Sequence, residues 1–403
     1  MKTGELGFAV NNTEPKLTYD YIFSNFYKII ALFYLFMRYF TCFLLASLLF
    51  SCNNNSNEKH VFTSGSLTDL VRDTLWIEKD INTQWLGTDF TYLEKDGKSV
   101  LGQFNGHRLL LYDVETGDLL SAQSFKEEGP NGIGSFISGS LISQDSMLFL
   151  SSGKQLIVAD HGGKVLTRHD LPAHENTVRG SSHYATFVHN PIYLKGNNVT
   201  VTDVPFVLKA PMLEYEDWLL QYNMQTGEER YVRFPFPEKY EGFLDDSEFC
   251  HYSHAYSESR KEHYISFAAD DKLLCIKDGK SYWVDAGSNK TMEFLRGTTE
   301  KSGEYIVFNP NPESSQYGTL QYSPWHQVLV RAAKLSVGSE HKVENRSFIV
   351  LDKSLTKTAE LAFTSNEFSS LGFFTPHGFY LKLAQQESDD KIGYAKIILP
   401  GME

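Results

Sequence analysis

The sequence has few cysteines and comparatively few basic residues. Four cysteines among 403 residues exclude a fold built on a framework of disulfides. There are 37 lysines and arginines against 50 aspartates and glutamates, so the formal net charge is −13. Because an acidic surface repels phosphate backbones, nucleic acid is not expected as a partner.

Long helical patterns and catalytic signatures are scarce as well. Few segments place apolar residues at helical spacing for more than two turns, and short apolar or alternating runs take their place. The Gly-x-Ser-x-Gly elbow of many hydrolases and the regular Asp-x-Asp-x-Asp-Gly calcium loop are both absent. The sequence therefore favours an all-β fold and indicates no catalytic residue, no metal and no cofactor.

One apolar run near the N-terminus indicates where the protein works. After Met37 and one arginine comes the apolar stretch Tyr39 to Phe50, and Leu49-Phe50-Ser51-Cys52 resembles a lipobox. A secretory signal combines a positive start, an apolar core too short to span a bilayer and a small-residue cleavage site. We predict that residues 37–51 are a lipoprotein signal peptide and that Cys52 carries the lipid.

The predicted cleavage site divides the chain into four parts. Residues 1–36 are interpreted as an over-long start or as a disordered or helical extension, and residues 37–51 as the signal. Residues 52–60 contain mostly asparagine and serine and are expected to form a flexible tether. Residues 61–403 then form the globular domain.

A start at Met1 is the alternative to a start at Met37. Ile22 to Phe50 would then be an apolar stretch long enough to span a bilayer, interrupted by Lys28 and Arg38. Charges near the middle of a span are unfavourable, and a span does not need the lipobox. The lipoprotein interpretation is therefore preferred.

A lipidated Cys52 would hold the globular domain at a membrane of the cell envelope, most simply the outer membrane, on a face that the sequence does not specify. Without residues 1–51 the chain keeps 33 basic and 47 acidic side chains, a net charge of −14. Aromatic residues make up 14% of the sequence. This fraction is typical of strands and equally of a surface on which sugar rings stack.

A recurring hairpin is the main indication of the fold. Each copy is an apolar run, an aspartate or asparagine, a tight turn and a second strand. A glycine such as Gly117 supplies the positive φ that closes such a turn. Three clear copies and two weaker ones are Leu109 to Leu120, Gln155 to Leu166, Trp218 to Glu229, Leu273 to Val284 and Phe348 to Leu361.

The spacing of the hairpins indicates a propeller. The turns are centred near 117, 162, 227, 279 and 354, so the intervals are 45, 65, 52 and 75 residues. A repeat of about 40–50 residues is typical of a four-stranded propeller blade. We expect insertions in the two longer intervals, at Tyr193 to Glu216 and Asn309 to Gln321.

The two ends of the domain indicate the total number of blades. Ser66 to Lys79 is a strand without a nearby partner, while Gly378 to Leu383 and Gly393 to Leu399 are the last strands. Pairing of the N-terminal strand with the last blade would close a ring of about six blades and remove exposed edges. A β-sandwich is the alternative, but it does not explain five copies of one hairpin.

The lipobox, the hairpins and two further motifs resemble an uncharacterised family of Bacteroidetes lipoproteins. The motifs are Glu128-Gly129-Pro130-Asn131-Gly132-Ile133-Gly134 and Tyr322-Ser323-Pro324-Trp325-His326-Gln327-Val328-Leu329-Val330-Arg331. The resemblance spans roughly residues 60–400 and implies a six-bladed β-propeller, but no activity. Ser323 and Val330 stand where that family would carry an aspartate and a tyrosine.

Cysteine and histidine occur together once, in Cys250-His251-Tyr252-Ser253-His254. Residues three apart on a strand face opposite sides, so His251 and His254 are not expected to share a metal ion. Cys250 and Cys275 are expected on the first and third strands of one blade. Two strand spacings amount to about 10 Å, which is beyond disulfide reach, so we predict two buried thiols.

The first strands of all blades surround one axis in a propeller. Arg179, His183, His251 and His254 are predicted to lie on or near such strands and to form a polar funnel that binds a ligand. A hydrogen-bonded structural role is the alternative for each of them.

The function predicted from these observations is that of a membrane-anchored binding module for a glycan, a peptide or a partner protein of the envelope. The alternative is an extracytoplasmic hydrolase or lyase that acts from the central funnel. A propeller can host either function, so the fold does not decide between them. A deep pocket with converging carboxylates or histidines of strongly shifted pKa would favour the enzyme.

Overall fold

The structure is a computed structural model that describes residues 37, 62–172, 175–176, 180–181, 184, 190–303, 305–335, 343–386 and 388–403. The predicted signal helix, the tether and Cys52 lie outside the described residues. Among the described residues, no helix combines the length and the apolar character needed to cross a membrane.

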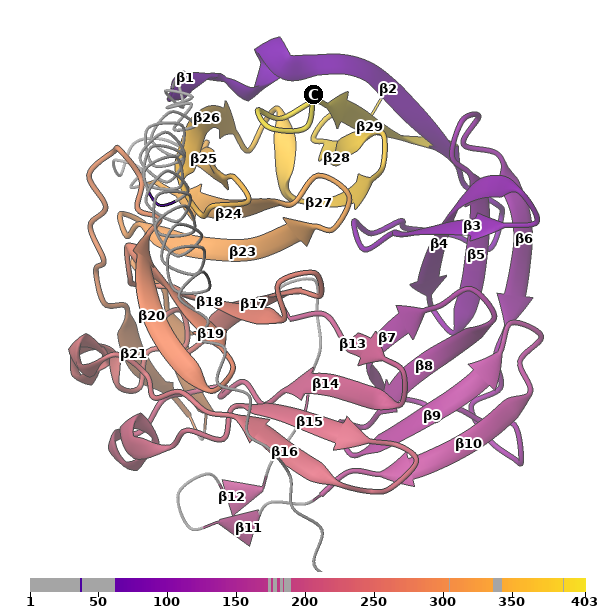
Figure 1. Cartoon of the computed structure of the whole chain (residues 1–403), viewed down its shortest axis with the longest axis horizontal. Coiled ribbons are helices and arrows are strands. Elements are labelled where there is room, and N and C mark those ends of the chain that lie inside the picture. Colours follow the sequence, from indigo (N-terminus) through magenta and orange to yellow (C-terminus); the bar gives the residue numbers. More distant parts are fainter. Residues whose placement is uncertain are drawn as a thin grey trace, which may run out of the picture. The chain divides into compact units, whose positions relative to one another are not determined.

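Six antiparallel sheets are arranged in a ring, so the predicted all-β propeller of six blades is confirmed (Figure 1). Blade 1 contains β3 (Thr91–Lys95), β4 (Lys98–Asn105), β5 (Arg108–Asp113) and β6 (Leu119–Ser124). Blade 2 contains β7 (Ile137–Ile142), β8 (Ser146–Ser151), β9 (Gln155–Asp160) and β10 (Val165–Asp170). Blade 3 contains β13 (Tyr193–Lys195), β14 (Asn198–Thr202), β15 (Leu219–Asn223) and β16 (Glu229–Val232).

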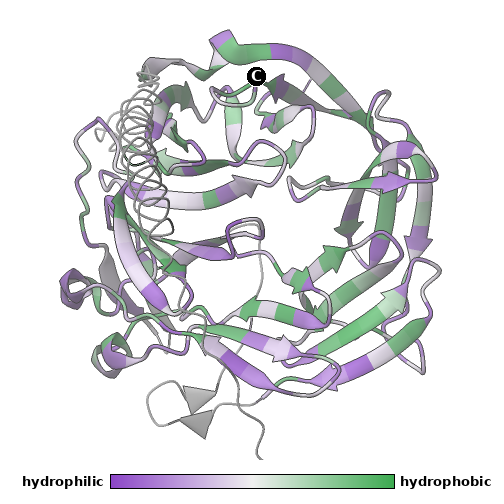
Figure 2. Cartoon of the chain, in the orientation of Figure 1, coloured by the Kyte–Doolittle hydropathy of each residue, from purple (hydrophilic) through white to green (hydrophobic). Residues whose placement is uncertain are grey.

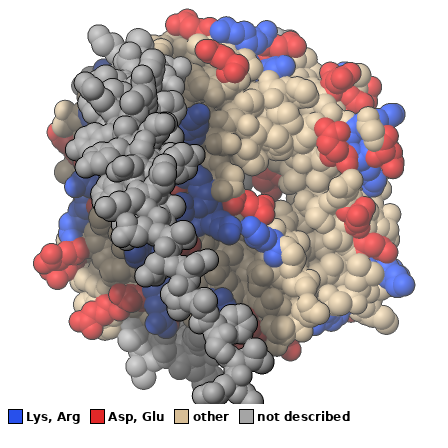
Figure 3. Space-filling model, viewed as in Figure 1, with Lys and Arg blue, Asp and Glu red and all other residues tan. Residues whose placement is uncertain are grey.

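The second half of the ring consists of blades 4 to 6. Blade 4 contains β17 (Tyr252–Ser257), β18 (Glu262–Phe267), β19 (Lys272–Lys277) and β20 (Lys280–Asp285). Blade 5 contains β23 (Gln316–Ser323), β24 (Val328–Lys334), β25 (Asn345–Leu351) and β26 (Lys357–Thr364). Blade 6 contains β27 (Phe368–Thr375), β28 (Gly378–Leu383), β29 (Lys391–Ile397) and β2 (Val71–Glu78). The first strand of each blade is the innermost (Figure 1). The space-filling view shows an opening at the centre of the ring, the channel, with charged side chains of both signs beside it (Figure 3).

All five predicted hairpins join the third and fourth strands of a blade, in blades 1 to 5. In blades 1, 2, 3 and 5 the side chain of the aspartate or asparagine accepts hydrogen bonds from the turn. The Asp113 carboxylate accepts the N–H groups of Glu115 and Thr116, and Asn223 does the same in blade 3. Blade 6 has no such hairpin because its fourth strand, β2, comes from the N-terminal end of the domain.

The positions predicted for the insertions in the two long intervals are correct only in part. Tyr193–Lys195 and Gln316–Ser323 are strands β13 and β23 rather than inserted loops. Of the additional elements in the two long intervals, η2 (Ala210–Glu214) lies within the predicted range. The others start before the predicted ranges: β11 (Glu175–Asn176), β12 (Gly180–Ser181), β21 (Thr298–Ser302) and β22 (Tyr305–Asn309). A further element, η3 (Glu238–Phe243), lies in the interval of 52 residues, where no insertion was predicted. The spacing of turns gives only the length of an interval, so it could not place the insertion within it.

The N-terminal segment closes the ring, as predicted, and reaches further than predicted. β2 pairs with β29 and completes blade 6. Upstream of it, β1 (Thr63–Ser66) pairs in parallel with β26 and adds a fifth strand to blade 5, and η1 (Leu67–Leu70) connects the two strands. Residues 63–78 therefore join blades 5 and 6 directly.

The described residues form six hydrophobic core clusters, and each lies between two neighbouring blades. Leu67 is fully buried between blades 5 and 6. Leu75 and Ile77 of β2 are buried between blades 6 and 1. Apolar residues are correspondingly frequent in the strands of the blades (Figure 2). The segment that closes the ring thus also supplies core residues to two of its six interfaces.

Arg331 shows how one interface is reinforced. Its guanidinium is fully buried and donates to Ser266 Oγ and to four main-chain carbonyls of blade 4 and the chain after it. The Tyr317 ring lies 3.5 Å from the guanidinium carbon. Burial lowers the pKa of Arg331 to about 10, so the side chain stays charged at neutral pH. An arginine of blade 5 therefore holds blade 4 through a fully used set of donors.

Cys250 and Cys275 are both buried and form no disulfide, which confirms the prediction for this pair. Cys250 lies two residues before β17 and Cys275 lies in β19. Burial raises the pKa of the Cys275 thiol to about 12, so this thiol is un-ionised at neutral pH.

A substitution at Gly117 tests the closure of the ring. Gly117 has φ 76°, its carbonyl accepts the N–H of Glu78, and a Cβ there would lie 2.0 Å from the carbonyl oxygen of Trp76. Gly97 has φ 73° in the β3–β4 turn, with open space around it. We expect Gly97→Ala to lower the free energy of unfolding by about 1–2 kcal/mol through backbone strain alone.

Gly117→Ala should lower the free energy of unfolding by about 1–3 kcal/mol more than Gly97→Ala, because β2 must also move. The measurement is urea denaturation of both variants beside the parent protein. Equal losses for the two variants would show that the contact of this turn with β2 contributes nothing to stability.

Candidate functional site

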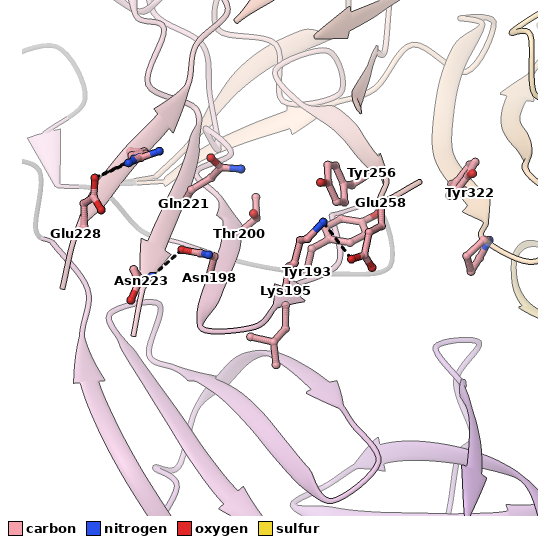
Figure 4. Close-up of a pocket in the computed structure, with 13 residues that line it drawn as sticks. Tyr193, Lys195, Asn198, Thr200, Gln221, Asn223, Glu228, Tyr256, Glu258 and Tyr322 are labelled. Carbon is pink, nitrogen blue, oxygen red and sulfur yellow. Dashed lines mark hydrogen bonds and ion pairs between the residues drawn. The ribbon is translucent and has the colours of Figure 1, made fainter. Parts of the chain in front are cut away.

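A cleft of about 530 Å³ opens between blades 3 and 4 and is the best candidate for a functional site (Figure 4). It lies at the end of the blades that carries the β13–β14, β15–β16 and β17–β18 turns. Most of its lining comes from blade 3, with two residues from blade 4 and two from blade 5. The lining residues are Tyr193, Leu194, Lys195, Asn198, Thr200, Gln221, Asn223, Glu228, Arg230, Tyr256, Glu258, Tyr322 and Pro324.

One wall of the cleft is built from rows of polar side chains that cross blade 3. Thr200 is paired with Tyr193 on one side and with Gln221 on the other, and Gln221 is paired with Arg230. A second row runs parallel to it, since Asn198 is paired with Lys195 and with Asn223. Residues two apart on a strand face the same side, so the two rows share one surface of the sheet.

Alternation along β15 explains why a cleft forms here. Leu220 and Tyr222 are buried between blades 2 and 3. Leu219, on the other face, is buried in the core between blades 3 and 4. Gln221 and Asn223 follow it on that same face but line the cleft instead. The interface between blades 3 and 4 is therefore apolar at one end and polar and open at the other.

The charged groups of the cleft are paired with one another. Lys195 lies 3.1 Å from the Glu258 carboxylate across the two blades, and Arg230 lies 2.8 Å from that of Glu228 (Figure 4). These pairs are largely exposed, so they add little to stability. They leave the lining without net charge, because two cations face two anions.

A pair of histidines lies behind the cleft. His254 Nε2 is 2.9 Å from His263 Nδ1, and the two rings are stacked with centroids 5.2 Å apart. The ring of Tyr193 contacts His254, that of Tyr256 contacts His263, and the Gln221 amide lies 3.5 Å from His263 Nε2. The pair thus supports the tyrosines and the glutamine that line the cleft.

Both histidines are neutral at pH 7. Burial lowers the pKa of His263 to about 4. Burial, together with the neighbouring His263, lowers the pKa of His254 well below its usual value. Among the described residues, no group of three or more histidine, cysteine, aspartate or glutamate side chains is placed to hold a metal ion. The pair is therefore a hydrogen-bonded element of the interface between the blades.

The four residues predicted to form a polar funnel do not meet in the described part of the structure. Arg179 and His183 lie outside the described residues. His251 is partly buried just before β17, where the Gln316 amide lies 3.2 Å from its Nε2. His254 lies on β17, the innermost strand of blade 4, but is fully buried.

His254 does not line the channel because an innermost strand turns its two faces to the neighbouring blades and only its edge to the axis. Ligand binding by the four residues remains a prediction. The cleft residues were not identified from the sequence. The signal that could have indicated them is the change from Leu219 to Gln221 and Asn223 on one face of β15.

The relatives of the chain agree with this architecture. The model of a family described as a domain of unknown function, DUF4221, matches residues 64–323. The chain belongs to the DUF4221 family. No curated protein matches the sequence.

A crystal structure of a DUF4221 member from Bacteroides vulgatus shares the fold, with a TM-score of 0.67 and 16% identity. The likeness covers 81% of this chain and 97% of that one. A protein described as exported, from Bacteroides fragilis, gives a TM-score of 0.47 at 7% identity, covering 84% of this chain and 100% of that one. This second score indicates no more than a distant likeness in shape. The comparisons thus establish the DUF4221 family and its fold, and they assign no activity.

The buried histidine pair predicts a pH dependence of stability. The folded-state pKa of His263 is about 4, below the value of about 6.5 expected in the unfolded chain. The unfolded chain therefore binds more protons between these values, and the free energy of unfolding falls as the pH is lowered from about 6.5 to 4. Each histidine contributes a slope of up to about 1.4 kcal/mol per pH unit.

Denaturation curves at several pH values measure this slope. The double variant His254→Asn, His263→Asn should show a shallower slope than the parent protein between pH 6.5 and 4. His169→Asn, a substitution of a partly exposed histidine on β10, should leave the slope unchanged. An unchanged slope in the double variant would mean that the buried pair takes no part in the acid sensitivity.

Proposed function

We propose that the protein is a lipid-anchored binding module of the cell envelope whose cleft between blades 3 and 4 holds a neutral glycan. The observation that carries the proposal is the composition of the cleft: amide and hydroxyl groups in two rows, three tyrosines at its sides and no net charge. Ligand sites are commonly concave, with aromatic walls and a few polar groups that fix orientation.

A glycan matches this lining better than the other ligands considered. Sugar hydroxyls both donate and accept hydrogen bonds, as do the amides of Asn198, Gln221 and Asn223 and the hydroxyl of Thr200. Aromatic rings such as those of Tyr193 and Tyr256 offer flat apolar surface beside a polar group. A strongly charged ligand would have to displace one partner of an existing ion pair.

The cleft gives no specific support to a hydrolase or lyase. Acid–base catalysis by two carboxylates requires environments that push their pKa values apart. Glu228 and Glu258 are both exposed, and each already has a cationic partner. His254 and His263 have strongly lowered pKa values, but both are buried behind the lining.

The anchor belongs to the same proposal. A lipid on Cys52 would hold the propeller at a membrane, most simply the outer membrane, and the tether would lead to β1 at the outer edge of blade 5. From Cys52 to Phe62 an extended chain reaches at most about 35 Å. The ligand-binding domain would therefore stay close to the membrane surface, within reach of glycans and proteins of the envelope.

A substitution of Gln221 tests whether the cleft binds the glycan. The side chain lies in the middle of one polar row, so Gln221→Ala should weaken glycan binding about tenfold through loss of its hydrogen bonds. The measurement is isothermal titration with cello-, manno-, malto- and chito-oligosaccharides of two to eight sugars. Gln123→Ala, on the outermost strand of blade 1, is the matched control and should bind as the parent does. Equal affinities of the two variants for the sugar that binds would place the site elsewhere.

Removal of the lipid acceptor tests the anchor. Cys52→Ala should move the protein from the membrane fraction to the soluble fraction, whereas Cys42→Ala, within the predicted signal, should not. Mass spectrometry of the parent protein from native membranes should find a lipidated Cys52 at the N-terminus. An unmodified protein that begins at Met1 would contradict the lipoprotein proposal.

A further inference from the structure

Three aromatic rings meet beside the channel, at the same end of the blades as the cleft. Trp325 is 44% exposed, and its ring centroid lies 5.5 Å from that of Tyr92 in an edge-to-face arrangement. Tyr92 in turn lies 6.4 Å from the ring of His377. Tyr92 belongs to β3 of blade 1, Trp325 to the β23–β24 turn of blade 5 and His377 to the β27–β28 turn of blade 6. We call these three residues the mouth cluster.

The mouth cluster adjoins the cleft through the chain itself. Tyr322 and Pro324 line the inner end of the cleft, and Trp325 is the next residue after Pro324. Because consecutive Cα atoms are about 3.8 Å apart, Trp325 lies immediately beside the inner end of the cleft. Turns between first and second strands all lie at one end of a propeller, which places the two features on one continuous surface.

The turn that carries Trp325 is held in a fixed conformation. The N–H of His326 donates to Ser323 Oγ, and that of Gln327 donates to the Ser323 carbonyl at 2.8 Å. Ser323 is fully buried, and Tyr322 accepts a hydrogen bond from Ser257 of blade 4 at 3.0 Å. A ring that is already ordered loses little freedom when a ligand stacks on it.

A second concavity continues the surface beyond the mouth cluster. His377 also lines a smaller cleft of about 270 Å³ between blades 6 and 1. Its other walls include Glu115 of the β5–β6 turn and Lys396 of β29. Polar concave surface therefore lies on both sides of the aromatic rings.

We infer that the mouth cluster is a second subsite, and that the ligand is a linear oligosaccharide that extends from the cleft across Trp325 toward His377. This inference rests on the proposed function of the cleft and specifies the ligand: a neutral chain longer than the cleft can hold. A sugar ring would stack on Trp325, while its hydroxyls would reach the polar groups beside it. The length of the ligand, rather than the identity of one sugar, would then determine affinity.

Ligand length separates the two subsites experimentally. The probes are the cello-, manno-, malto- and chito-oligosaccharide series of two to eight sugars, titrated against the full protein. For the series that binds, affinity should rise with length up to a plateau. Trp325→Ala should leave the affinity for the shortest ligand unchanged and reduce that for the longest about three- to tenfold, and Trp325→Phe should recover most of this loss.

Trp283→Ala is the matched control. Trp283 is also 44% exposed, but it lies on β20, the outermost strand of blade 4, away from the cleft. This variant should bind short and long ligands as the parent does. Thermal unfolding of both tryptophan variants confirms that each is folded before it is titrated.

The outcomes distinguish the subsite from the cleft. If Gln221→Ala weakens binding and Trp325→Ala has no effect at any length, the second subsite is wrong and the glycan-binding cleft stands. If Trp325→Ala weakens short and long ligands equally, the two-subsite arrangement is also overturned. If no oligosaccharide binds, while peptides of three to eight residues do so with sensitivity to Gln221, the glycan proposal itself fails.

Discussion

The pairing of β2 with β29 is the interaction on which the rest of the structure depends. A meander of four-stranded blades has two ends, and without β2 the last blade would expose both a strand edge and its apolar face. β2 removes the edge through its ladder with β29, and its Leu75 and Ile77 fill the interface between blades 6 and 1. Because every core cluster lies between two blades, the set of interfaces between blades is complete only when the ring is closed. β1 extends the same closure to blade 5 through its parallel ladder with β26.

At the candidate site, the packing between two blades differs from the apolar packing that joins the blades elsewhere. Adjacent blades are held by apolar side chains on facing sheets, and the interface between blades 3 and 4 follows this rule at the end where Leu219 is buried. Toward the other end, the same face carries Gln221 and Asn223, and a cleft opens between the blades. Between the two regions lies the stacked pair of His254 and His263, buried and neutral. The closed ring keeps the two walls of this cleft in place although little apolar contact joins them there.

The sequence predicted the architecture well because its signals were local. In blades 1, 2, 3 and 5 the hairpin has an aspartate or asparagine whose side chain accepts turn amides, and four of the five hairpins have a glycine with positive φ. The placement of insertions at Tyr193 to Glu216 and Asn309 to Gln321 was only partly right, because spacing gives the length of an interval and not its content: η2 lies in the first range, but β13 and most of β23 are blade strands within the two ranges. The funnel prediction placed His254 on an innermost strand, where it does lie. It did not anticipate that such a strand turns its side chains toward the neighbouring blades.

Local patterns were thus sufficient to establish an acidic all-β chain, the repeating hairpin, the six blades and the closing role of the N-terminal strand, because each follows from neighbouring residues or from their period. The cleft, the histidine pair behind it and the meeting of Tyr92, Trp325 and His377 required the tertiary structure. Tyr92, Trp325 and His377 come from parts of the chain that are far apart in the sequence. His254 and His263 are only nine residues apart, but the periodicity of the sequence does not indicate which faces of neighbouring blades oppose one another. Only the closure and twist of the ring decide whether two polar strand faces meet as a packed interface or as an open site.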